Sequence, residues 1–237
     1  SMPIGAYSEK HIMPENKLVP VPDGVSDEVA SCVTLKGITA EYLLHRAYPL
    51  KKGDKVLYHA AAGALGQILC PWANFIGAEI IGTVGSKEKE EIAKKNGCHH
   101  VINYTDKDFV KEVEKIVGKN GIDVVYDGVG LKTFEGSIEV LKIRGMMVAF
   151  GNASGYVDKI DVKKHINAKG LFFTRPSIAH YTIEREELLE SAKKVFDAVL
   201  TGKFKIEISK KYSLDQVKQA HEDLEGRLLT GPAVIKP

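Results

Sequence analysis

Six short apolar runs, separated by amphipathic stretches, dominate the middle of the chain. They are KVLYHA at 55–60, EIIGTV at 79–84, HVINY at 100–104, IDVVYDGV at 122–129, GMMVAFG at 145–151 and GLFFTR at 170–175. Most of the runs are continuous rather than alternating, which is typical of strands buried on both faces of a parallel sheet. Strands that alternate with helices in this way predict a doubly wound, mostly parallel α/β sheet with helices on both faces.

The stretches between the runs carry helical stripes. Apolar residues recur at helical spacing at 68–76 and at 109–117. Gly77, Gly97 and Gly118 follow the ends of three predicted helices, where a left-handed residue is favoured. Pro71 lies inside the first of these helices, where proline removes a backbone hydrogen bond.

The two flanks have a different pattern. Residues 1–24 are rich in proline and glycine, and we expect irregular chain there. A long helix is expected from Asp27 to about Tyr48, interrupted near Gly37, and another over 184–200. A short strand is expected at 205–208, a helix opened by the capping box of Ser213 and Gln216, and a last strand at 232–235.

Charge and cysteine content exclude several classes of protein. The 237 residues carry 33 Lys and Arg against 31 Asp and Glu, so nothing indicates a nucleic-acid partner. No apolar run is long enough to span a membrane, and the first residues do not have the pattern of a signal peptide. Cys32, Cys70 and Cys98 are widely separated, which argues against disulfides and a zinc site and favours the cytoplasm.

The segment HAAAGALGQI at 59–68 follows the first buried strand and opens the first helix. Dinucleotide sites of the Rossmann type place G-x-G-x-x-G at this point, so that backbone N–H groups at the helix start face the diphosphate. Here Ala61, Gly63 and Gly66 stand at the three glycine positions. The sequence therefore favours a nucleotide site, and the alternative is a set of small residues that eases a tight turn.

The end of the second predicted strand bears on the choice of nucleotide. An NAD site usually has an acidic residue there, whereas this strand ends in Gly85 and Ser86, followed by Lys87 and Lys89. A hydroxyl and an ammonium suit a 2′-phosphate, so NADPH is favoured over NADH. The alternative is that 87–95 is a solvated helix face, in which Glu88 and its acidic neighbours would oppose a phosphate.

Further segments carry a family resemblance. They are LKGIT at 35–39, GTVG at 82–85, VINY at 101–104, VYDGVG at 125–130, FGNASG at 150–155, TRPS at 174–177 and AHEDLEGR at 220–227. With the glycine segment, they span nearly the whole chain in order. The chain resembles the quinone oxidoreductase (zeta-crystallin-like, zinc-free) branch of the medium-chain dehydrogenase/reductase superfamily.

The resemblance implies an enzyme that passes a hydride from NADPH to a quinone without zinc. It implies that Gly63, Ala64, Leu65 and Gly66 hold the pyrophosphate and that Ser86, Lys89 and Tyr104 surround the 2′-phosphate. Residues implied beside the ribose and nicotinamide are Thr39, Val129, Phe150, Asn152, Phe173 and Arg175, and Arg227 is implied at a phosphate. Each has a structural alternative: Tyr104 as a strand-end aromatic, Phe150 as a core residue, Arg227 as a helix cap.

The resemblance also implies a domain plan. Residues 1–48 correspond to the end of a β-rich, GroES-like catalytic domain and a connecting helix, 49–180 to the NADPH-binding domain, and 181–237 to segments that return to the catalytic domain. Most of that catalytic domain is not in the sequence, so we expect a fragment, and whether it is active alone stays open. A homodimer is expected through the edge strand 170–175.

No residue emerges as catalytic, since hydride transfer to a quinone asks the protein mainly for orientation. His59 is expected to be a packed or hydrogen-bonded residue, and Asp123 and Asp127 to mark a strand end and turn rather than a catalytic pair. Two other functions stay open: a related NADPH-dependent enone reductase, and a non-catalytic NADPH-binding module.

Overall fold

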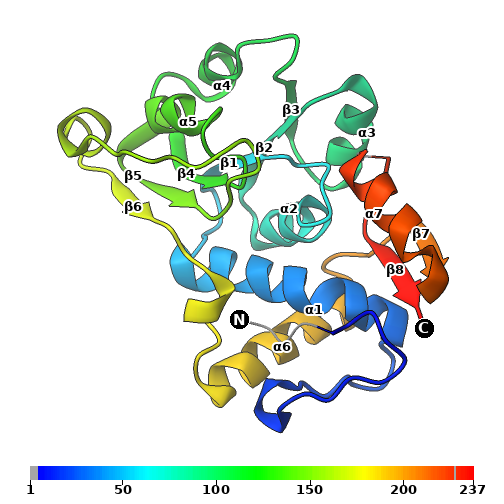
Figure 1. Cartoon of the computed structure of the whole chain (residues 1–237). Helices are drawn as coiled ribbons and strands as arrows, with labels where there is room; N and C mark the ends of the chain where they lie inside the picture. Colours follow the sequence, from blue (N-terminus) through cyan, green and yellow to red (C-terminus); the bar gives the residue numbers. More distant parts are fainter. Residues whose placement is uncertain (1–4, 227) are drawn as a thin grey trace.

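A six-stranded sheet forms the centre of the computed structural model, which describes residues 5–226 and 228–237 (Figure 1). All pairings in this sheet are parallel, and the strand order is β3-β2-β1-β4-β5-β6. The strands are β1 (Lys55–His59), β2 (Glu79–Val84), β3 (His100–Asn103), β4 (Ile122–Asp127), β5 (Leu141–Ala149) and β6 (Phe172–Thr174). The predicted doubly wound sheet is confirmed, and its order is that of a Rossmann fold.

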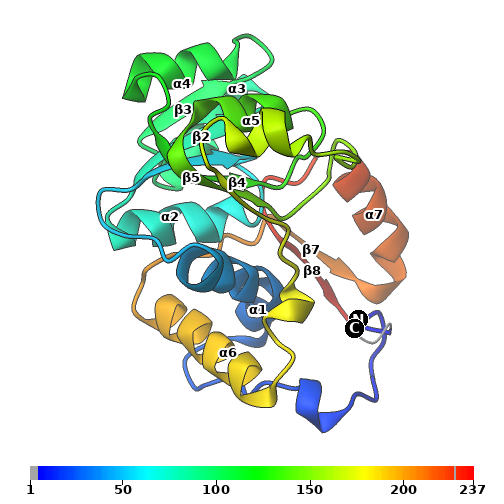
Figure 2. The ribbon, with the colours of Figure 1, turned by 90° about the vertical axis from the view of Figure 1, so that its left-hand side faces the viewer.

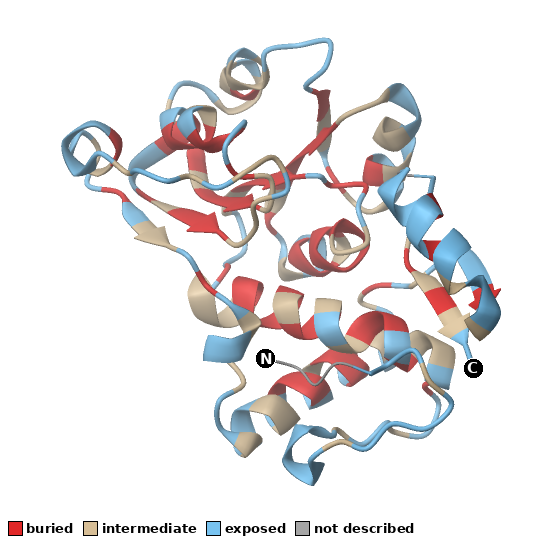
Figure 3. Cartoon of the chain, viewed as in Figure 1, coloured by how far each residue is buried: buried red, intermediate tan, exposed pale blue. Residues whose placement is uncertain are grey.

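Helices cover both faces of the sheet and bury it in two apolar layers (Figure 3). Helices α2 (Gly66–Ile76) and α3 (Lys87–Lys95) contribute to one layer, and α4 (Phe109–Val117) and α5 (Phe134–Val140) contribute to the other. In β1, Val56 and Tyr58 face the first layer while Leu57 faces the second. This burial on both sides explains the continuous apolar runs in the sequence.

Outside α2 lies a pair of long helices, α1 (Asp27–Tyr42) and α6 (Arg185–Leu200) (Figure 2). The expected interruption of α1 near Gly37 is wrong, since the helix is continuous to Tyr42 and then passes into a π-helical turn at Leu43–Ala47. Gly37 permits close packing instead: a Cβ there would lie 2.4 Å from Cγ1 of Val195 on α6. Glycine therefore sets the spacing of the helix pair.

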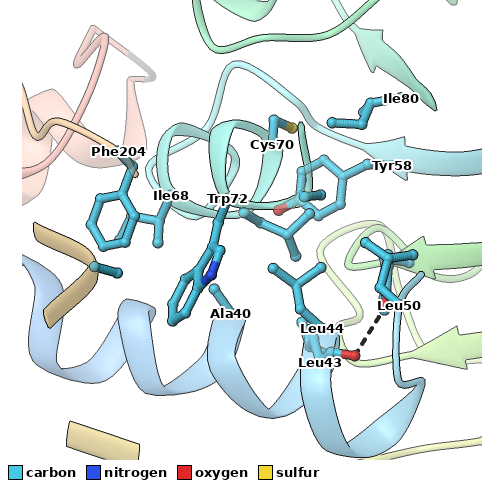
Figure 4. Close-up of a cluster of buried hydrophobic side chains, with 14 of the residues drawn as sticks. Ala40, Leu43, Leu44, Leu50, Tyr58, Ile68, Cys70, Trp72, Ile80 and Phe204 are labelled. Carbon is cyan, nitrogen blue, oxygen red and sulfur yellow. Dashed lines mark hydrogen bonds between the residues drawn. The ribbon is translucent and has the colours of Figure 1, made fainter. Parts of the chain in front are cut away.

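Side chains from α1, α2 and the sheet meet in one core (Figure 4). Trp72 of α2 packs against Phe204, and Leu43 and Leu44, in the π-helical turn after α1, lie near Tyr58 of β1. The chain then turns back toward β1 through a hydrogen bond from the Leu50 N–H to the Leu44 carbonyl, 2.9 Å long. This core fixes α1 relative to the sheet.

A buried ionic cluster also joins α1 to α6. The carboxylate of Glu41, 1% exposed, accepts a hydrogen bond from the Ser191 hydroxyl at 2.7 Å. The same carboxylate pairs with Arg46 at 3.1 Å and with Lys194 at 3.4 Å. Because both cations are partly exposed, only the carboxylate carries a large desolvation cost, which these three partners offset.

The remaining elements are short. They are the 3-10 turns Glu15–Lys17, Ile178–His180 and Leu214–Gln216, the π-helical turn Val162–Asn167, helix α7 (Val217–Glu225), and strands β7 (Lys210–Ser213) and β8 (Ala233–Lys236), which form a parallel pair. The capping box of Ser213 and Gln216 is confirmed. The strand expected at 205–208 is wrong: Phe204 is buried and Ile206 packs against the core, but pairing with β8 begins only at Lys210.

Helix α2 continues through Pro71, which lacks the N–H that would bind the Gln67 carbonyl. In the portion of the chain covered by the structure, no helix has the length and apolar character needed to cross a membrane.

Candidate functional site

The carboxyl ends of the six parallel strands lie along one edge of the sheet. The order of the strands reverses between β1 and β4, and ligands of open α/β sheets bind at such a point. The turns after β1, β2, β4 and β5 meet at this edge and contain most of the candidate residues. The fold therefore brings together segments that are far apart in the chain.

The turn between β1 and α2 is shaped by contacts between backbone atoms. Ala60 has a positive φ of 63°, and a Cβ on Gly66 would lie 2.2 Å from the Ala61 carbonyl oxygen. Gly63 is exposed at the top of the turn, and Ala64 and Leu65 are half-buried. Within the described residues, the backbone N–H groups of Ala64 and Leu65 donate to no protein acceptor. These free donors at the start of α2 fit the diphosphate of a dinucleotide.

The end of β2 supplies a second set of polar groups. Ser86 is the N-cap of α3 but its hydroxyl makes no capping bond, and Lys89 forms no ion pair with any residue in the described ranges. Tyr104, after β3, leans over the same strand end: a Cβ on Gly85 would lie 2.7 Å from the tyrosine oxygen. A hydroxyl, an ammonium and a phenol thus stand near one helix N-terminus, which fits a phosphate monoester.

An acidic side chain shares this helix N-terminus. Glu88 is exposed in the first turn of α3. Hydrogen bonds from its own backbone N–H and from the Ser86 hydroxyl lower the pKa of its carboxyl group. Glu88 is therefore ionised at neutral pH and is directed toward the group that would bind a phosphate.

The loops after β4 and β5 are joined by backbone hydrogen bonds. Ala153 N–H donates to the Gly128 carbonyl at 3.2 Å, and Ser154 N–H donates to the Val129 carbonyl at 2.8 Å. Phe150 stacks on Tyr58 with ring centroids 6.3 Å apart, and a Cβ on Gly128 would lie 2.9 Å from the Phe150 ring. Val129, Phe150 and Asn152 are all half-buried in this pair of loops.

Other candidate residues lie elsewhere. Thr39 is half-buried on α1, and its hydroxyl donates to the Leu35 carbonyl at 2.8 Å. Phe173 lies within β6 and packs edge-on against Phe134 under α5, with centroids 6.3 Å apart. Arg175 is exposed directly after β6. Arg227 lies outside the described residues.

Sequence reasoning did not find the buried polar chain beneath this edge. His59, the last residue of β1, bonds through Nδ1 to Thr83 Oγ1 at 2.9 Å and through Nε2 to Ser137 Oγ at 3.0 Å, so the expectation of a hydrogen-bonded residue is confirmed. Burial lowers the pKa of His59. Ser137 bonds in turn to Asp127 at 3.2 Å. The sequence does contain one sign of this polar chain. Asp127 stands at the end of an apolar run and directly before a glycine-rich turn.

The described side chains give no support for a metal site. Throughout residues 5–226 and 228–237, no three His, Cys, Asp or Glu side chains gather in a way that could hold a metal ion.

Comparison with known proteins identifies the family. The profile of the zinc-binding dehydrogenase family matches residues 64–199. The chain is 44% identical to 2-haloacrylate reductase of a Burkholderia species and 41% identical to quinone oxidoreductase 1 of Escherichia coli (strain K12). Each alignment covers 99% of this chain and 72% of the relative.

A solved structure agrees with this assignment. The crystal structure of Escherichia coli quinone oxidoreductase complexed with NADPH superposes with a TM-score of 0.94 at 40% identity. It covers 100% of this chain, and the match spans 73% of that protein. The chain therefore belongs to the quinone oxidoreductase branch of the medium-chain dehydrogenase/reductase superfamily.

Proposed function

We propose that this chain binds NADPH and orients it for the transfer of a hydride to a quinone, without zinc. The observation that carries the proposal is that the N–H groups of Ala64 and Leu65, at the start of α2, have no acceptor among the residues that the structure describes. They lie at the switch point of a sheet whose next strand, β2, is followed by Gly85 and Ser86 rather than by an acid. The relatives named quinone oxidoreductase, and the NADPH complex of one of them, support the same function.

In this proposal the residues of the chain bind NADPH and orient its nicotinamide half, while NADPH supplies the hydride when it is bound. The turn at 63–66 holds the diphosphate through backbone N–H groups and the start of α2. Ser86, Lys89 and Tyr104 hold the 2′-phosphate. The loops at 128–130 and 150–155 border the nicotinamide half and keep water from it. A quinone carbonyl is already electrophilic, so the protein needs no general acid to activate it.

A second substrate class is supported by one comparison. The relative that is 44% identical to this chain is named for reduction of 2-haloacrylate, an activated alkene rather than a quinone. An enone or haloacrylate reductase would use the same cofactor site. A third candidate is an NADPH-binding module without turnover, since the matched relatives are longer than this chain.

Calorimetric titration with NADPH and NADH, followed by a turnover assay, tests these proposals. We expect NADPH to bind more tightly than NADH. Loss of reduced-nicotinamide absorbance with quinones, but not with enones or 2-haloacrylates, would support a quinone reductase. Turnover of the alkenes alone would support the second candidate, and binding without turnover would support the third. No binding of either nucleotide would refute the proposal.

We also propose that the chain forms a homodimer through the edge strand at 170–175. In support, β6 is the last strand of the sheet, and Phe172 on it is 57% exposed. Ile143, on the neighbouring β5, is 68% exposed. Paired edge strands would cover this apolar surface. Analytical ultracentrifugation over a concentration series tests this, and a monomer at every concentration would refute it.

The cytoplasmic location expected from the sequence is supported by the three thiols, all free and buried.

A further inference from the structure

A buried carboxylate lies at the root of the loop that follows β4. Asp127 is the last residue of that strand and is 0% exposed. Its Oδ1 accepts the N–H groups of Val129 at 2.8 Å and Gly130 at 2.9 Å. Its Oδ2 accepts the hydroxyls of Thr133 at 2.7 Å and Ser137 at 3.2 Å. Four hydrogen bonds thus compensate for the burial of this group.

The polar chain behind Asp127 has a defined direction. An ionised carboxylate can only accept, so the Ser137 hydroxyl donates to it and its oxygen accepts the Nε2–H of His59. His59 Nδ1 is then left to accept the Thr83 hydroxyl. A neutral ring suits this arrangement, and burial lowers the pKa of His59 as required. Every donor in the chain therefore points toward Asp127, and Ser137 is held in place.

The loop that Asp127 holds is also fixed from its other side. The Ser154 hydroxyl donates to the Val129 carbonyl at 2.8 Å, and Leu131 N–H donates to the Gly155 carbonyl at 3.1 Å. The backbone at Val129 and Gly130 is therefore held by two hydrogen bonds to Asp127. Several more hydrogen bonds join this loop to the 152–155 loop, so its conformation is fixed from both sides. This segment lies next to the switch point of the sheet, on the side of β4 away from the 2′-phosphate groups.

We propose that Asp127 is a positioning residue for the nicotinamide half of the dinucleotide. It sets the backbone path at Val129 and Gly130 through hydrogen bonds, and the chain through Ser137 and His59 keeps its carboxylate oriented. The inference rests on the proposed function, because it requires a dinucleotide to cross this edge. It goes beyond that function in assigning a role to a residue that touches no ligand.

The test separates the two halves of the cofactor. Calorimetry measures the dissociation constants of NADPH and of adenosine 2′,5′-bisphosphate, which contains only the half that Ser86 and Lys89 would bind. In Asp127→Ala we expect NADPH to bind about tenfold more weakly, the equivalent of one or two lost loop hydrogen bonds, and the bisphosphate to bind as in the unaltered chain. A role confined to overall stability would weaken both ligands together.

Two more variants keep the test decisive. Asp127→Asn can accept the same two N–H groups and turn its amide toward the two hydroxyls, so we expect NADPH affinity within about threefold of the unaltered chain. Ser137→Ala removes both hydrogen bonds of the Ser137 hydroxyl, to Asp127 and from His59, but leaves the two N–H bonds of Asp127 in place, and it serves if Asp127→Ala does not fold; we expect a loss of about threefold, again for NADPH alone. Asp123→Asn is the matched control, since Asp123 accepts a backbone N–H from Lys55 near the opposite end of β4.

The outcomes distinguish this inference from the proposed function. If Asp127→Ala loses affinity equally for both ligands, or for neither, the positioning role is refuted and the proposed function stands. Asp127→Asn as weak as Asp127→Ala refutes the hydrogen-bonding account in favour of charge. An unaltered chain that does not bind NADPH refutes the proposed function, and this inference with it.

Discussion

Replacing Gly66 by alanine tests how the turn between β1 and α2 is built. The new Cβ would lie 2.2 Å from the oxygen, 2.7 Å from the carbonyl carbon and 3.1 Å from the Cα of Ala61. All three atoms belong to the backbone, so no side-chain rotation relieves the clash. The start of α2 must therefore move away from β1 by about 1 Å to restore ordinary contact distances.

The expected effect follows from this displacement. Overpacking of this kind costs about 1–3 kcal/mol. In a chain of this size each kcal/mol lowers Tm by about 2–4 °C, so we expect a fall of roughly 4–8 °C for the middle of that range. The N–H groups of Ala64 and Leu65, which have no acceptor among the described residues, move with the helix, so NADPH binding should weaken by about 100-fold, the equivalent of about two lost hydrogen bonds to a charged group.

Thermal denaturation and calorimetric titration measure the two effects, and Gly63→Ala is the matched variant. A Cβ on Gly63 would lie 3.1 Å from the Ala60 carbonyl oxygen, at an exposed position. We expect its Tm to change by less than about 2 °C and its NADPH affinity to fall by about tenfold, because the methyl group stands where the diphosphate approaches. Gly66→Ala with unaltered Tm and NADPH affinity would refute the reasoning.

Three further predictions concern charged or titrating groups. Glu88→Gln should tighten NADPH by about threefold and leave NADH unchanged, because an ionised carboxylate next to Ser86 opposes a phosphate; equal changes for both nucleotides in calorimetry would contradict this. Glu41→Ala should lower the free energy of unfolding by about 2 kcal/mol in urea denaturation, because it leaves the buried Ser191 hydroxyl without its acceptor while Arg46 stays partly exposed; a loss below about 1 kcal/mol would contradict it. Burial lowers the pKa of His59, so the unfolded chain binds a proton that the folded chain does not, and stability should fall as the pH drops below about 6.5. The stability of His59→Gln should depend less steeply on pH over that range. A slope identical to that of the unaltered chain would show that His59 does not cause the loss of stability.

Strand-forming segments were predictable because burial on both faces leaves a local signal. The runs at 55–60 and 79–84 give β1 and β2 almost to the residue. The glycine turn was equally local, since its strand, turn and helix are adjacent in the chain. At 205–208 the apolar pattern was real, but Phe204 and Ile206 contact the core without a strand beside them, and pairing with β8 starts at Lys210. Pairing depends on distant chain, which local pattern does not report.

The polar chain at His59 could not be predicted for the same reason. Its members come from β1, β2, β4 and α5, and each is ordinary when taken alone: a histidine at a strand end, and threonine, aspartate and serine near turns. Only the sheet order places Asp127 beside Ser137 and His59. Gly37 shows the converse case, in which a residue expected to break a helix is there to admit Val195 of another.

The separation of the two edges of the sheet has a practical consequence for engineering. The candidate phosphate-binding groups at 63–66, Ser86, Lys89 and Tyr104 all follow the carboxyl end of a strand, whereas the turn that enters β4 lies at the opposite edge. There Gly118 has a positive φ of 81°, a Cβ added to it would meet no described atom within 4 Å, and Lys119 is exposed. A fluorophore or affinity tag attached at Lys119 would therefore report on the molecule without obstructing its nucleotide, and a peptide spliced into this turn should be accommodated at small cost in folding.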